Sequence, residues 1–233
     1  MTALLWAGAA GAWLFIAVFL IDGWTRPGYS PARHAVSALA TGPRGWIQTA
    51  NFLACGLAIT AAAAVLPLGL VSPRPVPTIG WVTDEDAASG GPATVLGAFL
   101  EAGTGHLLLG AAVVVFGLSV IASGAFPMDP MRGYPPGTPE GDPPHTSRRH
   151  VRHDQAGTVV FTALPAAAAI AAFVLPELAW KLYSGTTAAA ALAGLVAFGY
   201  AWEEDHPRTG LVQRATIVVG WTWLGALFLY AAA

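Results

Sequence analysis

Residues 3–21 read ALLWAGAAGAWLFIAVFLI, an apolar run without a single charged side chain. About 18 apolar residues suffice to cross roughly 30 Å of hydrocarbon as an α-helix. Five similar runs follow, and none shows the two-residue alternation of a barrel strand. The sequence therefore predicts an all-α fold without β-sheet, in which one integral-membrane domain, residues 1–233, forms a bundle of six transmembrane helices. The six runs are residues 3–21, 46–71, 94–126, 157–175, 182–202 and 211–233.

The composition of the chain agrees with this class. Hydrophobic residues make up 55% of the sequence and charged residues 10%, whereas a soluble domain has about 25% charged residues. The single cysteine, Cys55, excludes an intramolecular disulfide and a thiolate metal cage. A net charge of −2 gives no basic surface for nucleic acid. We therefore expect a lipid bilayer as the main partner and no nucleic-acid binding.

Positive charge is concentrated on alternate connections between the runs. The opposite connections hold only Arg74 and Lys181. Lysine and arginine in short loops are retained in the cytoplasm, so we expect the arginine-bearing connections there and both termini outside. The abundance of arginine, alanine and glycine is typical of a GC-rich bacterial genome, which predicts a multi-pass protein of a bacterial cell membrane. The cytoplasmic set comprises Arg26, Arg33, Arg44, Arg132, Arg148, Arg149, Arg152, Arg208 and Arg214.

The three arginine-bearing connections open with related sequences, in which an aspartate precedes an arginine and then a glycine. Two explanations stay open: a common ancestry of three helical hairpins, or the general preference of helix ends at a membrane surface for Asp, Arg, Pro and Gly. Paired charges cost less to remove from water than single ones. We therefore expect one charge network formed by Asp22, Arg26, Asp129 and Arg132.

The connection 127–155 is long and rich in proline and histidine. Proline removes a backbone donor and fixes φ, so this segment cannot continue a helix. Long loops in compact domains are either functional or disordered, and the tyrosine and histidines favour a lid that packs over the mouth of the bundle. A metal site needs three or four ligands at suitable spacing. The sequence shows no such set, so we expect no metal centre, with His145, His150 and His153 as weak candidate ligands.

The third run contains two ionisable residues, Glu101 and His106. Counted along a helix from Thr94, His106 lies about 18 Å deep, so we expect its side chain near the midplane of the membrane. Ionisable groups at this depth are costly and often mark a functional site. Two interpretations stay open: a hydrogen bond to polar residues of the second run such as Asn51, or a role in ligand binding or proton transfer.

Three motifs resemble those of a known family. They are Asp22-Gly-Trp-Thr-Arg-Pro-Gly-Tyr-Ser-Pro-Ala-Arg-His-Ala-Val-Ser37, Phe126-Pro-Met-Asp-Pro130 and Gly133-Tyr-Pro-Pro-Gly-Thr-Pro139, with the histidines that follow. In these motifs, and along nearly the whole chain, the sequence resembles the bacterial integral-membrane family called "domain of unknown function 998". The resemblance implies a six-helix membrane protein without an established activity. Members of that family often have a His-x-x-x-His arrangement before the fourth run, whereas here Arg149 stands four residues before His153.

Three classes of function remain open. The first is binding of a small molecule or a lipid head group at the cytoplasmic ends of the first and third runs. The second is an intramembrane enzyme acting on a lipid or isoprenoid, with Asp129, His106 and His153 as candidate acid–base residues. The third is assembly with a second copy or with another membrane protein through small-residue helix faces. No motif identifies a cofactor, and the candidate binding residues are Asp22, Arg26, Tyr29, Ser30, His34, Ser37, Asn51, Glu101, Arg132 and Tyr134.

Overall fold

The computed structural model describes residues 1–71 and 103–233 of the chain. Within these residues, six α-helices are long and apolar enough to cross a membrane, and an isolated bridge between Met131 and Tyr134 is the only β-pairing. The expected all-α architecture with six membrane-spanning helices is therefore confirmed. The elements are α1 (Thr2–Thr25), the short 3₁₀ helix η1 (Val36–Ala40), α2 (Gly45–Val71), α4 (Thr104–Ala125), α5 (Arg148–Val174), α6 (Leu178–Glu203) and α7 (Thr209–Ala232).

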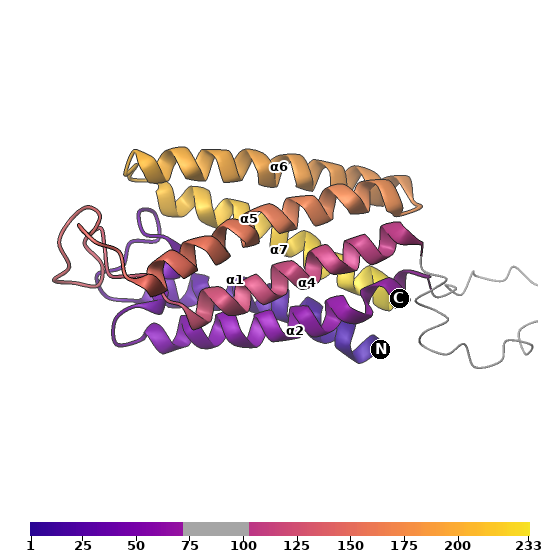
Figure 1. The fold of residues 1–233 in the computed structure, drawn as a ribbon, viewed down its shortest axis with the longest axis horizontal. Coiled ribbons are helices and arrows are strands. Elements are labelled where there is room, and N and C mark those ends of the chain that lie inside the picture. Colours follow the sequence, from indigo (N-terminus) through magenta and orange to yellow (C-terminus); the bar gives the residue numbers. More distant parts are fainter. Residues whose placement is uncertain (72–102) are drawn as a thin grey trace, which may run out of the picture.

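The six helices form a ring in the order of the chain (Figure 1). Each helix packs against the helices before and after it, and α7 closes the ring by packing against α1. Neighbouring helices run in opposite directions, so both termini lie at one end of the bundle. Three connections lie at the other end, namely residues 26–44, 126–147 and 204–208. We call this the arginine-rich end, because the arginines other than Arg74 lie in these connections or in the adjoining helix turns.

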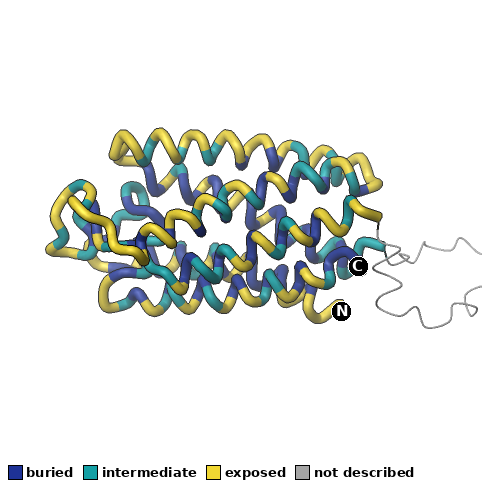
Figure 2. The backbone as a smooth tube through the Cα atoms, in the orientation of Figure 1, coloured by how far each residue is buried: buried dark blue, intermediate teal, exposed yellow. Residues whose placement is uncertain are grey.

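Aromatic residues fill the middle of the ring. The indole of Trp221 stacks on Phe15 at a centroid distance of 5.3 Å and meets Phe116 edge-on at 4.7 Å. Offset and edge-to-face arrangements are those that aromatic rings prefer. On the outside, large apolar side chains of every helix stay exposed, and α6 is exposed along most of its length (Figure 2). Helices that are apolar on both their inner and outer faces are typical of a membrane bundle.

The contact between α2 and α4 depends on three glycines spaced seven residues apart: Gly110, Gly117 and Gly124. A Cβ at Gly117 would lie 2.4 Å from the hydroxyl of Thr60 and 3.0 Å from its backbone nitrogen. Added Cβ atoms at the other two positions would also approach side chains of α2 to within 3.0 Å. Small residues let membrane helices pack closely, and close packing drives helix association in lipid. The α2–α4 seam is therefore a tightly closed part of the ring.

The start of α5 differs from the expected one. Residues 148–155 were expected in the connection but form the first turns of α5. The hydroxyl of Ser147 accepts a hydrogen bond from the backbone N–H of His150 at 3.2 Å. Such a cap satisfies one of the free donors at a helix start, so the helix begins here and carries His150 and His153 on one of its faces.

The expected depth of His106 is wrong. Helix α4 begins at Thr104, with Gly103 in an extended conformation at its start, so His106 lies in the first turn and not at the middle of a helix. Its expected neighbour Asn51 lies near the opposite end of the bundle, where it donates a hydrogen bond to the carbonyl of Phe15 at 3.1 Å. Glu101 lies outside the described residues.

Candidate functional site

The three connections at the arginine-rich end fold together into a cap. The rings of Tyr29, His34 and Tyr134 contact one another at centroid distances of 5.1 to 5.3 Å and join the first connection to the second. The side chains of Met128 and Met131 are also buried in the core. Residues 128–134 of the segment that follows α4 therefore pack onto the first connection, whereas residues 144–147 are exposed; the lid stays a prediction.

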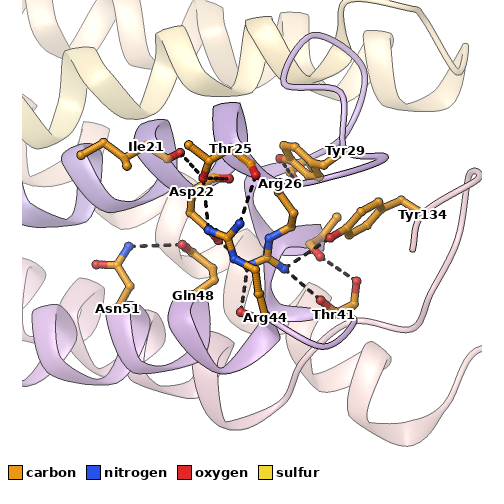
Figure 3. Close-up of polar contacts among 12 residues, drawn as sticks. Ile21, Asp22, Thr25, Arg26, Tyr29, Thr41, Arg44, Gln48, Asn51 and Tyr134 are labelled. Carbon is orange, nitrogen blue, oxygen red and sulfur yellow. Dashed lines mark hydrogen bonds and ion pairs between the residues drawn. The ribbon is translucent and has the colours of Figure 1, made fainter. Parts of the chain in front are cut away.

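A closed cluster of charges lies beneath this cap, where α1 ends (Figure 3). The carboxylate of Asp22, only 3% exposed, accepts hydrogen bonds from Arg26 and from Arg44, the latter at 2.6 Å. Arg26 also donates to the carbonyl oxygens of Thr41 at 3.0 Å and Arg44 at 2.8 Å, and to the hydroxyl of Tyr134 at 3.3 Å. A buried carboxylate requires such partners because its desolvation is expensive. The cluster ties the end of α1 to the start of α2 and to the second connection.

A second closed cluster surrounds Arg214 at the start of α7. Its guanidinium donates to the carbonyl oxygens of Pro31 at 2.7 Å and His34 at 3.0 Å, and to the hydroxyl of Tyr29. That hydroxyl in turn donates to the carbonyl of Ala35 at 2.8 Å. Burial raises the pKa of Tyr29 to about 12, so the phenol stays neutral. Arg214 thus fixes the first connection against α7.

The expected four-residue charge network is not formed. Asp129 does not pair with Arg132: its carboxylate accepts hydrogen bonds from the backbone N–H of Ser147 at 2.6 Å and from the Ser147 hydroxyl at 2.7 Å. Burial opposes ionisation of Asp129, but these hydrogen bonds and the nearby His150 outweigh it and lower the pKa of the carboxyl. Asp129 thereby holds Ser147, the residue that caps α5. This candidate acid–base residue has a structural role.

Arg132 finds its partners in other parts of the cap. Its guanidinium donates to the carboxylate of Asp142 at 2.7 and 3.1 Å and to the backbone carbonyl of Trp202 at 2.9 Å. It also lies over the indole of Trp202 at 3.9 Å and 3.6 Å from the carboxylate of Asp205. Only the first of the three Asp–Arg–Gly sequences therefore pairs its own aspartate and arginine, while Asp205 interacts with arginines of the other two connections.

The histidines of α5 have different environments. The Nδ1 atom of His150 accepts a hydrogen bond from the backbone N–H of Asp129 at 3.2 Å, and its Nε2 lies 3.3 Å from the carboxylate of Asp154. The Nδ1 atom of His153 lies 3.1 and 2.9 Å from the carbonyl oxygens of Ser123 and Phe126. Because carbonyl oxygens only accept hydrogen bonds, Nδ1 of His153 carries a proton, and in the neutral ring Nε2 then presents a lone pair.

The weak metal candidates do not converge. His145 is exposed in the second connection, whereas His150 and His153 are buried on α5. Within residues 1–71 and 103–233, no group of three or more histidine, cysteine, aspartate or glutamate side chains is placed to hold a metal ion.

A cavity of about 300 Å³ opens beside His153, between α5, α6 and α7. A second, inner chamber of about 50 Å³ shares part of this lining and reaches the aromatic centre of the bundle at Trp221. At the outer rim, Thr158, Thr162 and Gly199 are exposed on the outer surface of α5 and α6. The residues that line both spaces are Ser37, His153, Gly157, Phe161 and Gln213.

Polar groups without partners gather at the inner end of this cavity. Gln213, 6% exposed, accepts a hydrogen bond from the backbone N–H of Val36 at 2.6 Å, and its amide NH₂ has no hydrogen bond to any described residue. The indole N–H of Trp221 is buried and has no hydrogen-bond partner within the described ranges. Nε2 of His153 likewise has no hydrogen bond to any described residue. Buried polar groups are normally hydrogen-bonded, so this inner end offers a ligand the N–H groups of the Gln213 amide and the Trp221 indole as donors and Nε2 of His153 as an acceptor.

The cavity carries little charge. Within residues 1–71 and 103–233, no lysine or arginine lines either space, and Asp154 at the rim is the only aspartate or glutamate that does. The nearby arginines, Arg132 and Arg214, are bound to the cap as described. The inner end is thus polar without being cationic.

The candidate residues from the sequence fall into three groups. Ser37 and His153 line the cavity, whereas most of the others belong to the cap or to the hydrogen bonds beneath it. His106 is at the far end of α4. Sequence reasoning missed Gln213 and Trp221, although an amide inside the sixth apolar run is a signal of the same kind as His106. The cap group comprises Asp22, Arg26, Tyr29, Ser30, His34, Asn51, Asp129, Arg132 and Tyr134.

Comparison with known proteins identifies the family. The model of the family described as "Protein of unknown function (DUF998)" matches residues 9–105 and 85–230. Neither the curated proteins nor the solved structures include a match. Because the two matched ranges together extend over most of the sequence, this multi-pass membrane protein belongs to the DUF998 family of unknown function.

Proposed function

We propose that this protein binds an amphiphilic ligand, which enters sideways from the bilayer between α5 and α6. The observation that carries the proposal is the cavity itself, whose rim at Thr158, Thr162 and Gly199 faces the exterior and whose inner end holds the polar groups of His153 and Gln213. A molecule with an apolar chain and a polar end matches both parts. The site lies at the end of the bundle that the sequence indicated, but on α5–α7 and not on the first and third helices.

The size of the cavity limits what enters it. Small-molecule sites in proteins have volumes of about 300–1,000 Å³, and this cavity, at about 300 Å³, is at the lower limit. It therefore accommodates a polar end and the first part of one chain. Phe161, Leu195 and Phe198 are the apolar residues of the lining that contact this part of the chain, and the rest of the chain stays in the bilayer.

The proposal includes a position in the membrane. Lysine and arginine in short loops are retained on the cytoplasmic side of a membrane. The arginine-rich end therefore lies in the cytoplasm in this proposal, and both termini lie outside. Trp24 and Trp46, which are 77% and 70% exposed near this end, occupy the level of the lipid head groups. The ligand is accordingly taken from the inner leaflet.

Cysteine labelling tests the orientation. In a Cys55→Ser background, a cysteine introduced at Glu140, whose side chain is 70% exposed, stays protected from an impermeant reagent applied to intact cells. A cysteine introduced at Asp84 reacts. The opposite pattern would reverse the orientation and move the cavity to the outer leaflet.

Photo-crosslinking tests the binding. The purified protein in phosphatidylcholine nanodiscs is exposed to three diazirine-bearing probes with the same acyl or alkyl chain: a monoglyceride, a fatty acid and an alkyl phosphate. Labelling of peptides from α5 and α6 that line the cavity, by any one of the probes, supports the proposal. Labelling spread evenly over the outer faces of all six helices by every probe contradicts it.

A pair of glycine variants provides the control. A Cβ at Gly157 would have no heavy atom within 4 Å, and the residue lines both spaces, so Gly157→Leu fills the cavity without displacing the backbone. Gly185→Leu is the matched change on α6 away from the cavity, where a Cβ would meet only Ala172 at 3.8 Å. We expect the cavity label to disappear in Gly157→Leu and to persist in Gly185→Leu.

A further inference from the structure

We infer that the polar end of the ligand is an uncharged hydroxyl, as in a long-chain alcohol, an isoprenoid alcohol or an acylglycerol. This inference rests on the proposed function and specifies the ligand of the same site. It follows from the kind of hydrogen-bonding atom that each inner residue offers and from the absence of a lysine or arginine among the described residues of the lining.

His153 supplies the acceptor. Its Nδ1–H is directed to the carbonyl oxygens of Ser123 and Phe126, which fixes the tautomer through the end of α4. The lone pair on Nε2 can then only accept a hydrogen bond. A ligand that fills this position must donate a proton in a hydrogen bond, which a hydroxyl does and an ether, an ester or a carboxylate does not.

Gln213 and Trp221 supply the donors. The amide oxygen of Gln213 is held by the N–H of Val36 at 2.6 Å, so its nitrogen is the part left for a ligand. The indole N–H of Trp221 is a donor only and has no partner in the described part of the chain. A hydroxyl oxygen has two lone pairs and one proton. It can therefore donate its proton to Nε2 of His153 and accept a hydrogen bond from the Gln213 amide, whose nitrogen carries two N–H groups, while Trp221 lines the inner chamber beside them.

Charge excludes the common alternatives. A carboxylate or phosphate buried without a cationic partner is strongly disfavoured, and Arg132 and Arg214 are held by Asp142 and by the carbonyls of Pro31 and His34. Asp154 at the rim adds repulsion of anions. An ammonium group has donors only, so it would leave the N–H groups of Gln213 and Trp221 without acceptors.

Competition between ligands that differ only at the polar end tests this inference. Labelling of the cavity by a diazirine probe is measured in the presence of one competitor at a time. The competitors are a long-chain alcohol, its methyl ether, the corresponding fatty acid and the alkyl phosphate, with an isoprenoid alcohol and a monoglyceride as further hydroxyl compounds. We expect the hydroxyl compounds to compete at concentrations at least about tenfold lower than the others, because each of the others leaves a buried group unsatisfied.

Two variants alter the selectivity in a defined direction. Gln213→Glu keeps an oxygen for the Val36 N–H but replaces the donor by a negative charge, so a long-chain amine should compete better than the alcohol. Asp154→Asn removes the negative charge at the rim, so the concentrations at which the alcohol and the fatty acid block labelling should become more similar. Glu204→Gln, an exposed acid at the same end that does not line the cavity, should leave both concentrations unchanged. Monodisperse gel filtration verifies that each variant is folded.

The outcomes separate the two proposals. If the cavity is labelled but the fatty acid or the phosphate competes as well as the alcohol, the hydroxyl inference fails and the binding function stands. If alcohol and methyl ether compete equally, His153 does not accept a hydrogen bond from the ligand and the inference fails as well. If no probe labels the cavity in the wild-type protein, the binding function itself is refuted.

Discussion

The two halves of the ring place their buried polar side chains differently. In the half formed by α1, α2 and α4, the carboxylate of Asp22 is buried and paired with Arg26. In the half formed by α5, α6 and α7, a cavity opens, and Gln213 and Trp221 line it. Buried N–H groups without a partner among the described residues occur in both halves, at Arg26, Gln48 and Arg214 as well as at Trp221. The comparison therefore shows that an unpartnered donor indicates a ligand site only where it also borders a cavity.

The largest effect is expected from Asp22→Ala in the closed half. This change leaves Arg26 buried without its carboxylate, and breaking a buried pair in this way costs about 3–5 kcal/mol. Asp154→Ala, at the rim of the open half, should cost less than about 1 kcal/mol because its side chain is 62% exposed. Thermal unfolding in detergent measures both. Equal losses for the two variants would remove the distinction between the halves.

A smaller contrast is expected from two glycines. Gly117→Ala places a Cβ 3.0 Å from the backbone nitrogen of Thr60, and such overpacking typically costs about 1–3 kcal/mol. Gly157→Ala meets no atom within 4 Å and replaces a poor helix former by a good one, so it should stabilise by up to about 1 kcal/mol. The same unfolding assay compares them. A destabilised Gly157→Ala would mean that the α5 side of the cavity is packed, contrary to the structure.

Asp129 and Arg132 test whether two groups of contacts within the cap are energetically independent. Their carboxylate and guanidinium bind different partners, Ser147 and Asp142, so the losses for Asp129→Ala and Arg132→Ala should add to within about 0.3–0.5 kcal/mol. Asp129→Ala alone should cost about 1 kcal/mol, comparable with the loss of a helix cap. A coupling well above this limit in the double-mutant cycle would restore the single charge network expected from the sequence.

The sequence predicted the parts of this structure that depend on composition and helix length. Six apolar runs gave six helices, and the pairing of Asp22 with Arg26 follows from their position four residues apart at a helix end. The sequence did not predict ion pairs between different connections, because Asp205 comes close to Arg33 and Arg132 only in the folded chain.

The candidate site was predictable only in part. His153 was identified from its type and its place beside the lid, whereas His106 was placed wrongly because a helix was assumed to begin at Thr94. The cavity arises from packing, since Gly157 lines it while the equally small Gly117 lies against Thr60. Nothing in the local sequence distinguishes these two glycines, and the partners of Gln213 are likewise decided by the fold.

The smallest expected effect concerns pH and His34 in the closed cap. Burial, helped by the nearby charge of Arg33, lowers the pKa of His34 below its ordinary value. Its Nδ1 accepts a hydrogen bond from the backbone N–H of Ser30 at 3.0 Å, as a neutral ring requires. About one unit or more above the ordinary histidine pKa of about 6.5, the ring is neutral in both the folded and the unfolded chain, so its contribution to stability is fully present there.

As the pH falls below about 6.5, the unfolded chain binds the proton first, and stability is lost until the pH reaches the lowered pKa of the folded state. The melting temperature in detergent should therefore fall more steeply between pH 7.5 and 5.5, taken as roughly one unit either side of the ordinary histidine pKa, in the wild-type protein than in His34→Gln. His145→Gln serves as the control, because His145 is exposed and its removal should leave the slope unchanged. A melting temperature that falls more steeply in His34→Gln than in the wild type would contradict this expectation. It would mean that the cap stabilises the protonated ring of His34.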